Sequence, residues 1–117
     1  MTRILLVEDE ADVADMLRLA LVSAGHGWEV DVVRDAPTAK ARLSSQPYEV
    51  VVADWRIPGG DGLEIANMAA DRGAKTILMS GYLFLIPKGD TTRHQLLMKP
   101  MRPTELVGSV RQALHAK

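Results

Sequence analysis

Short apolar runs alternate with amphipathic stretches along the whole of this 117-residue chain. Each run is too short for a helix and is closed by polar or turn-forming residues. This pattern is typical of strands that are buried on both faces, as in a parallel sheet. It predicts five strands, at Ile4–Val7, Trp28–Val33, Val50–Ala53, Thr76–Met79 and Leu96–Met98.

Between these runs, apolar residues recur at the spacing of an amphipathic helix. Asp35 and Asp61 are placed to cap the second and third helices. The expected helices carry apolar stripes over Val13–Ala24, Ala36–Leu43, Gly62–Arg72 and Leu106–Leu114. Because strand and helix alternate throughout, we expect an α/β fold in which helices cover both faces of a parallel sheet.

The central strand, Val50–Ala53, runs directly into Asp54. A carboxylate at the end of a buried strand is costly unless it meets a metal, a cation or a reaction. Sites in open α/β sheets lie outside the carboxyl ends of the strands. Asp54 is therefore the first candidate for chemistry. A role as a helix cap is the alternative, but Asp61 is better placed for that.

Composition narrows the class of protein. A formal net charge of −1 argues against binding nucleic acid through a basic face, and the absence of cysteine excludes disulfides and thiolate chemistry. The start, MTRILLVEDE, is not a signal peptide, and no apolar run is long enough to span a bilayer. We expect one domain over residues 1–117, soluble and cytoplasmic, that contacts neither nucleic acid nor membrane.

The stretch Gly81–His94 departs from this rhythm. A crossover helix is expected between the fourth and fifth strands, but Pro87 and Gly89 disfavour a regular helix there. We expect an irregular connection with one or two helical turns. Its apolar run Tyr82–Ile86 either packs inward or forms an exposed patch.

Polar residues end four of the expected strands: Glu8 with Asp9, then Asp54, Ser80 and Lys99. At one edge of a sheet, the three carboxylates would repel each other unless a divalent cation and the Lys99 ammonium offset them. Oxygen ligands favour Mg²⁺ or Mn²⁺ over zinc. Such a site suits phosphoryl transfer, with Asp54 attacking to form an acyl phosphate while Lys99 and Ser80 hold phosphoryl oxygens.

Four motifs occur in a familiar order: LLVEDE, VVVADWRIPGGDGLE, ILMSG and LLMKP. Together they resemble the receiver domain of two-component response regulators over essentially the whole chain. The resemblance implies a flavodoxin-like, doubly wound (βα)₅ fold with strand order 2-1-3-4-5. It implies a stand-alone receiver, not a metabolic enzyme, that takes a phosphoryl group from a histidine kinase or a histidine phosphotransfer protein.

The resemblance also implies a role for each site residue. Asp54 is the phosphoacceptor, and Asp9, Asp54 and the Arg56 main-chain carbonyl bind Mg²⁺, with Glu8 acting through water. Ser80 matches the family's hydroxyl position and Lys99 its lysine, which a cis Lys99–Pro100 bond would aim at the acids.

Two features depart from the family's pattern. Leu96 stands where an aromatic residue commonly turns inward on phosphorylation, and the fourth helix is short or irregular. Many receivers bind partners or dimerise through this surface, so the fourth-helix region and the last helix are candidate homodimer surfaces. The departures keep open a second function, a protein-interaction module that works without phosphate.

An aspartate-based phosphatase is a third function, and it is disfavoured because Arg56 stands where its second aspartate would be.

Several other residues are expected to have structural roles. We expect Trp55 to be partly exposed, and the three histidines, His26, His94 and His115, to lie at the surface. The six methionines are expected to fill the core.

Overall fold

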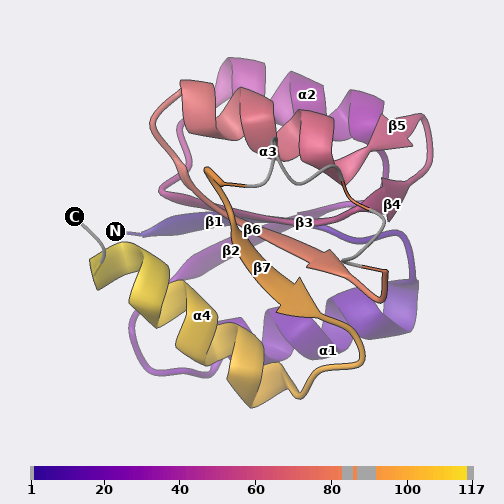
Figure 1. Ribbon diagram of the computed structural model, residues 1–117. Coiled ribbons are helices and arrows are strands. Elements are labelled where there is room, and N and C mark those ends of the chain that lie inside the picture. Colours follow the sequence, from indigo (N-terminus) through magenta and orange to yellow (C-terminus); the bar gives the residue numbers. More distant parts are fainter. Residues whose placement is uncertain (1, 83–85, 87–91, 116–117) are drawn as a thin grey trace.

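A five-stranded sheet lies between two layers of helices in the computed structural model, which describes residues 2–82, 86 and 92–115 (Figure 1). Helices α2 and α3 cover one face and helices α1 and α4 the other. The elements are β1 (Arg3–Val7), α1 (Ala11–Val22), β2 (Glu29–Val33), α2 (Ala36–Ser45), β3 (Val50–Asp54), β4 (Arg56–Ile57), β5 (Gly60–Asp61), α3 (Gly62–Asp71), β6 (Lys75–Ser80), β7 (Gln95–Met98) and α4 (Pro103–His115).

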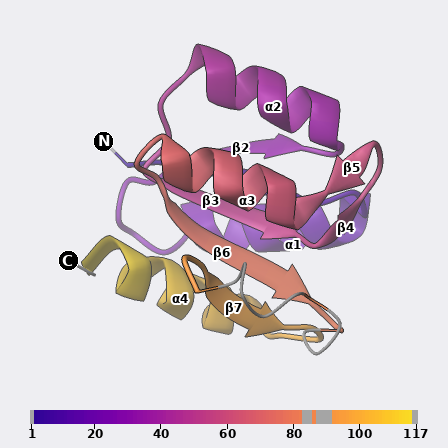
Figure 2. The same cartoon turned by 45° about the horizontal axis from the view of Figure 1, so that its top comes forward.

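The strand order is β2-β1-β3-β6-β7, with every neighbouring pair parallel. The predicted order 2-1-3-4-5 is therefore confirmed, with β6 and β7 as the fourth and fifth strands. Figure 2 shows β2 and β7 at opposite edges of the sheet. A small antiparallel pair, β4 with β5, was not expected from the sequence, because its two-residue strands carry no periodic signal.

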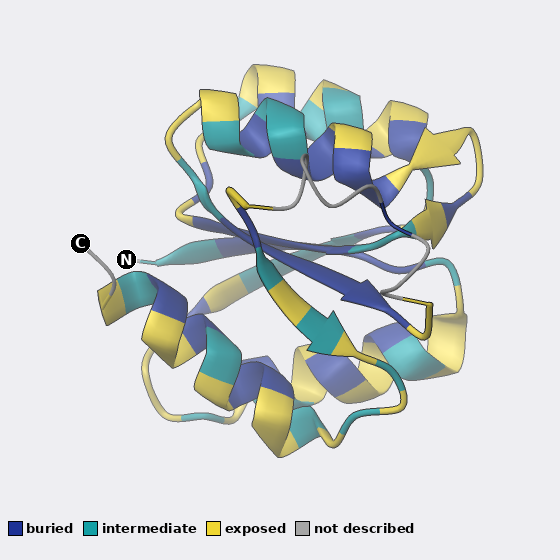
Figure 3. Cartoon of the chain, in the orientation of Figure 1, coloured by how far each residue is buried: buried dark blue, intermediate teal, exposed yellow. Residues whose placement is uncertain are grey.

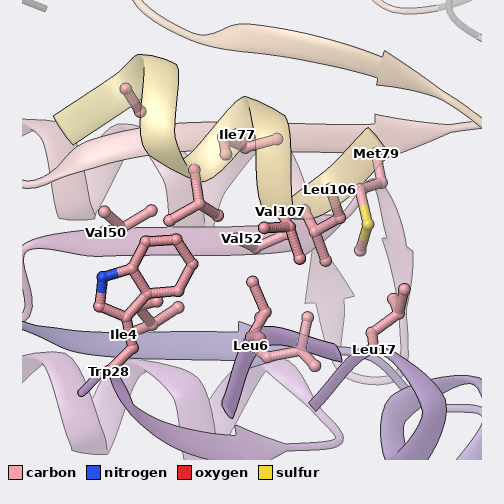
Figure 4. Close-up of a cluster of buried hydrophobic side chains, with 13 residues drawn as sticks. Ile4, Leu6, Leu17, Trp28, Val50, Val52, Ile77, Met79, Leu106 and Val107 are labelled. Carbon is pink, nitrogen blue, oxygen red and sulfur yellow. The ribbon is translucent and has the colours of Figure 1, made fainter. Parts of the chain in front are cut away.

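Alternate residues of the central strands β1 and β3 enter two separate cores, which explains why these strands are apolar on both faces. Ile4 and Leu6 point toward α1 and α4 and pack with Trp28, as Figure 4 shows. Leu5 and Val7 pack on the α2 and α3 side. Figure 3 shows the central strands buried and the exposed residues on the outer sides of the helices.

Both expected helix caps are present. The Asp35 carboxylate accepts a hydrogen bond of 2.7 Å from the Thr38 amide, and the Asp61 carboxylate one of 2.8 Å from the Glu64 amide. These caps satisfy first-turn amides that have no partner within the helix. They set the start of α2 and α3, and α3 begins directly after the loop that follows Asp54.

The predicted conformation of the β6–β7 connection, Gly81–His94, falls largely outside the described residues. Within its described part, no residue is helical. Ile86 is buried and belongs to a small cluster with Leu63 and Leu78, so this member of the apolar run packs inward. Tyr82, at the other end of the run, is 51% exposed.

The expected surface position of His94 is wrong, whereas His26 and His115 are exposed as predicted. The His94 Nε2 lies 2.7 Å from the Asn67 Oδ1 and its Nδ1 lies 2.5 Å from the Thr76 hydroxyl. Burial lowers the pKa of His94, and the neighbouring Arg93 lowers it further. Partners on α3 and β6 make the buried ring acceptable, and those partners lie far from it in the sequence.

The methionines do not all fill the core. Met79 is fully buried, but Met16 is 47% and Met98 is 60% exposed, so the expectation is wrong for these two. Met98 lies opposite Ser80 on β7, which is an edge strand of the sheet that the described residues form. Hydrophobic spacing alone does not distinguish an edge strand from a central one.

Candidate functional site

The carboxyl ends of β1, β3, β6 and β7 bring the predicted site residues to one edge of the sheet. Register places Val7 beside Ala53, Asp54 beside Met79, and Ser80 beside Met98. Glu8 and Lys99 follow directly on β1 and β7. Residues separated by up to 91 positions therefore meet at this edge.

Three carboxylates form the acidic part of the site. One carboxylate oxygen each from Glu8, Asp9 and Asp54 lies within 4.8 Å of the others. Glu8 is fully buried, while Asp9 and Asp54 are partly exposed, so the cluster opens toward solvent on one side. Closely spaced, hard oxygen ligands with an open side fit Mg²⁺ or Mn²⁺, which keep several of their waters.

Lys99 joins two of these acids. Its Nζ donates hydrogen bonds of 2.7 Å to the Glu8 Oε1 and 2.6 Å to the Asp54 Oδ2. Burial favours the uncharged amine, but the two carboxylates outweigh it and leave the pKa of Lys99 raised. Lys99 is therefore a firmly charged ammonium, and the predicted cis bond between Lys99 and Pro100 is present.

Two opposing effects also act on the pKa of Glu8. Burial raises the pKa of the Glu8 carboxyl, while the hydrogen bond from Lys99 and the one from the Glu10 amide lower it; the net direction is upward. Desolvation of a carboxylate accounts for this direction. Glu8 thus depends on Lys99 for its charge balance, and a second cation in the site would favour its ionised form.

Ser80 faces the same edge and is buried. Its Oγ accepts a hydrogen bond of 2.9 Å from the Tyr82 amide. The Arg56 amide lies 3.4 Å from the Asp54 Oδ1, a weak hydrogen bond that holds the loop after β3 against the Asp54 carboxylate. Trp55 is partly exposed, as expected, and packs on the cluster of Leu63, Leu78 and Ile86.

Sequence reasoning missed two supporting residues. Arg34, at the end of β2, donates a hydrogen bond of 2.9 Å to the Asp9 main-chain carbonyl. Gly62, the first residue of α3, donates one of 2.7 Å to the Trp55 carbonyl and leaves no room for a side chain against Asp54. The PGGDG turn signalled a tight backbone approach near Gly62, whereas no signal marked Arg34.

A hollow of about 360 Å³ lies beside the site. Its lining is mostly apolar and joins the first turns of α1 to the turn after β7; the lining residues are Glu10, Val13, Met16, Leu17, Lys99, Pro100 and Met101. The site is thus bordered by a surface on which an apolar partner group can rest close to Lys99.

Comparison with known proteins identifies the class. The chain belongs to the response regulator receiver domain family, whose model matches residues 4–111. Members of this family are signalling domains of two-component systems and not classical enzymes. The resemblance to receiver domains that the motifs indicated is therefore confirmed. Among the described residues, no helix is long and apolar enough to cross a membrane.

Individual relatives differ in how much of their length is shared. The chain is 32% identical to the receiver protein CpdR of Brucella abortus over 121 residues, 99% of each chain. It is 28% identical to the DNA-binding response regulator MtrA of Mycolicibacterium paratuberculosis, over 96% of this chain and 51% of that protein. The chain therefore spans about half the length of MtrA.

A solved relative shares the whole fold. TrrA of Thermotoga maritima, in complex with Mg²⁺ and beryllofluoride, superposes with a TM-score of 0.85 at 28% identity, covering 97% of this chain and 100% of that one. TrrA has also been solved in complex with the histidine kinase ThkA, with a TM-score of 0.83 to this chain. The flavodoxin-like fold with a parallel five-stranded sheet, expected from the sequence, is thereby confirmed.

Proposed function

We propose that this receiver accepts a phosphoryl group on Asp54 and signals through its phosphorylated state. One observation carries the proposal: the Lys99 ammonium contacts both Glu8 and Asp54, in a cluster that also includes Asp9. A nucleophilic carboxylate beside a fixed cation and further oxygen ligands is the arrangement that phosphoryl transfer requires.

Each residue has a defined role. Asp9, Asp54 and the Arg56 main-chain carbonyl would hold Mg²⁺ or Mn²⁺, and Glu8 would act through a bound water. When bound, the cation screens the negative charge of the incoming phosphoryl group. Lys99 binds a phosphoryl oxygen and keeps its proton throughout, consistent with its raised pKa. Ser80 donates its hydroxyl proton to another phosphoryl oxygen.

The transfer step is a displacement at phosphorus. A carboxylate oxygen of Asp54 attacks the phosphorus of a phosphohistidine, a phosphorus–oxygen bond forms, and the phosphorus–nitrogen bond breaks. The departing imidazole nitrogen keeps the electron pair and takes a proton. Attack by water later returns Asp54 to a carboxylate and releases inorganic phosphate.

The phosphodonor is a histidine kinase or a histidine phosphotransfer protein. The complex of TrrA with a histidine kinase supports this choice. The apolar hollow beside Lys99 supplies a surface on which such a partner can bring its histidine to Asp54. The output is altered partner binding or onward phosphotransfer, without direct contact with nucleic acid.

Intact mass tests the acceptor. The protein is incubated with Mg²⁺ and a small phosphodonor, and it gains one alkali-labile phosphate. Asp54→Asn abolishes this gain, whereas Asp15→Asn, on an exposed position of α1, retains it. An equal yield of labile phosphate in Asp54→Asn would contradict the assignment.

One observation favours the second candidate, a module that binds partners without phosphate. Leu96 is 40% exposed on the edge strand β7, where it offers apolar contact area in the absence of any phosphoryl group. A chain that gains no phosphate under any donor and Mg²⁺ condition, yet still binds its partner, would establish this function in place of the first.

A further inference from the structure

The guanidinium of Arg56 lies between two aromatic rings at the rim of the site. Its Cζ is 5.3 Å from the centroid of the Trp55 ring and 5.2 Å from that of the Tyr82 ring. Both distances are within the range of about 6 Å at which a cation is attracted to an aromatic face. Arg56 is exposed, so each of its contacts with a ring is weak. An anion that binds the guanidinium more strongly than the rings do can therefore displace them.

Each member of this stack is tied to the phosphorylation site through its backbone. The Arg56 amide contacts the Asp54 carboxylate at 3.4 Å, and the Tyr82 amide donates to the Ser80 Oγ at 2.9 Å. The Trp55 amide donates to the Met79 carbonyl at 2.8 Å, which fixes the loop after β3 to β6. The stack therefore links the acceptor strand to the segment that follows the Ser80 hydroxyl.

The two rings are held unequally. Trp55 is partly buried and packs against Leu63, Leu78 and Ile86. Tyr82 is 51% exposed. Removing the guanidinium from between them would leave Trp55 in place but would free Tyr82 on its inner side.

We propose that Arg56 is a second cationic side chain, beside Lys99, that binds the phosphoryl group on Asp54, and that its transfer from the rings to this group releases Tyr82. The inference rests on the proposed phosphoacceptor function. Phosphorylation replaces a single charge by about two and adds three strong acceptor oxygens. Lys99, which is shared between two carboxylates, and a divalent cation together offset only the charge of the three carboxylates, so the added negative charge calls for another cation.

Chemistry favours the transfer. A guanidinium binds phosphate oxygens with paired hydrogen bonds, which are stronger than an exposed contact with an aromatic face. Ser80 donates its hydroxyl proton to the phosphoryl group, so the Oγ that accepts from the Tyr82 amide takes part in the same event. Both contacts of Tyr82, with the Arg56 guanidinium and with Ser80, are thus coupled to one event at Asp54.

The consequence is that Tyr82, and not a residue at position 96, is the aromatic side chain that changes position on phosphorylation. Leu96 has neither a ring nor a polar tip and cannot turn inward as an aromatic reporter would. Tyr82 is half exposed and carries both, so its release changes the surface beside the site. A partner that distinguishes the two states would read the position of Tyr82.

Nuclear magnetic resonance tests the transfer directly, with Mg²⁺ and beryllofluoride as the phosphoryl mimic. In the free protein, we expect ring currents to shift the Arg56 side-chain protons upfield. On addition of the mimic we expect these protons to move downfield together with the Asp54, Ser80 and Tyr82 amides. Unchanged Arg56 side-chain resonances, with shifted Asp54 and Ser80 amides, would overturn the proposal alone. Absence of any shift at Asp54 and Ser80 would overturn the phosphoacceptor function and this proposal with it.

A double-mutant cycle tests the coupling. Tyr82→Leu removes one competing ring, so the mimic should bind about two- to fivefold more tightly. In an Arg56→Met background, which itself binds the mimic more weakly, Tyr82→Leu should have no effect. Arg18→Met removes the same charge from an exposed position on α1 and should leave the Tyr82→Leu effect intact. An equal effect of Tyr82→Leu in all three backgrounds would overturn the coupling.

Discussion

Replacing Gly62 with alanine tests whether the first turn of α3 fixes the position of Asp54. A Cβ added at residue 62 would lie 2.0 Å from the Asp54 carbonyl oxygen and 2.9 Å from the Trp55 Cα. Both neighbours are backbone atoms, one at the end of β3 and one in the loop that follows it. They cannot rotate away as the end of a flexible side chain would.

The size of the clash sets the expected magnitude. Ordinary contact begins at 3.4 Å, so the 2.0 Å approach must open by about 1.4 Å. That movement also breaks the 2.7 Å hydrogen bond from the Gly62 amide to the Trp55 carbonyl. Overpacking and the lost hydrogen bond together should lower the free energy of unfolding by about 2–4 kcal/mol.

Function should fall further than stability. A displacement of about 1 Å at a reacting group can cost on the order of 100-fold in rate. We therefore expect Gly62→Ala to accept phosphoryl groups from a small phosphodonor about 100-fold more slowly, as followed by intact mass. Urea unfolding, followed by circular dichroism, gives the stability of the same samples.

Gly108 supplies a matched control. It lies in the exposed middle of α4, and a Cβ added there meets no atom within 4 Å. Gly108→Ala should stabilise the protein by about 0.5–1 kcal/mol and leave the phosphorylation rate unchanged. A Gly62→Ala protein with wild-type stability and rate would refute the reasoning.

Three further outcomes follow from the site and its surroundings. Asp9→Asn should weaken Mg²⁺ binding by about tenfold or more, since it removes a unit negative charge directly beside a divalent cation; Glu8→Gln should weaken it less because Glu8 would act through a bound water, and both are titrated by tryptophan fluorescence. In the folded state His94 has a pKa below its usual value. Its contribution to stability is therefore complete above about pH 6.5 and is lost as the pH falls below that. His94→Asn should flatten the dependence on pH, between about 7 and 5, of the free energy of unfolding measured in urea. Combining Arg56→Asn with Tyr82→Glu should speed hydrolysis of the acyl phosphate by about tenfold or more, because the Arg56 side chain that shields the phosphoryl group from water becomes smaller and Tyr82 becomes a general base.

Each of these predictions has an outcome that contradicts it. A larger loss of Mg²⁺ affinity in Glu8→Gln than in Asp9→Asn would reverse the two roles. If His94→Asn and the exposed control His115→Asn keep the same slope with pH, the buried ring does not control it. Unchanged decay of the acyl phosphate in the double variant would remove the shielding role of Arg56.

The sequence by itself determined the architecture and the members of the site. Both faces of the sheet are covered, so its central strands are apolar on both faces. In the sequence they stand out as short runs of consecutive apolar residues, at Ile4–Val7 and Val50–Ala53. Polar residues that end strands converge when the strands are parallel, so Glu8, Asp54 and Lys99 could be grouped by their order along the chain alone.

Only the tertiary structure decided which residues support the site and which polar groups are buried. His94 is buried because Thr76 and Asn67, 18 and 27 positions away, supply its hydrogen bonds. Met98 is exposed because its strand lies at the edge of the sheet. Arg56 stacks between Trp55 and a ring that follows a different strand. The periodicity of apolar residues within one segment indicates which of its faces is buried. The features named above depend instead on pairs of segments that folding brings together.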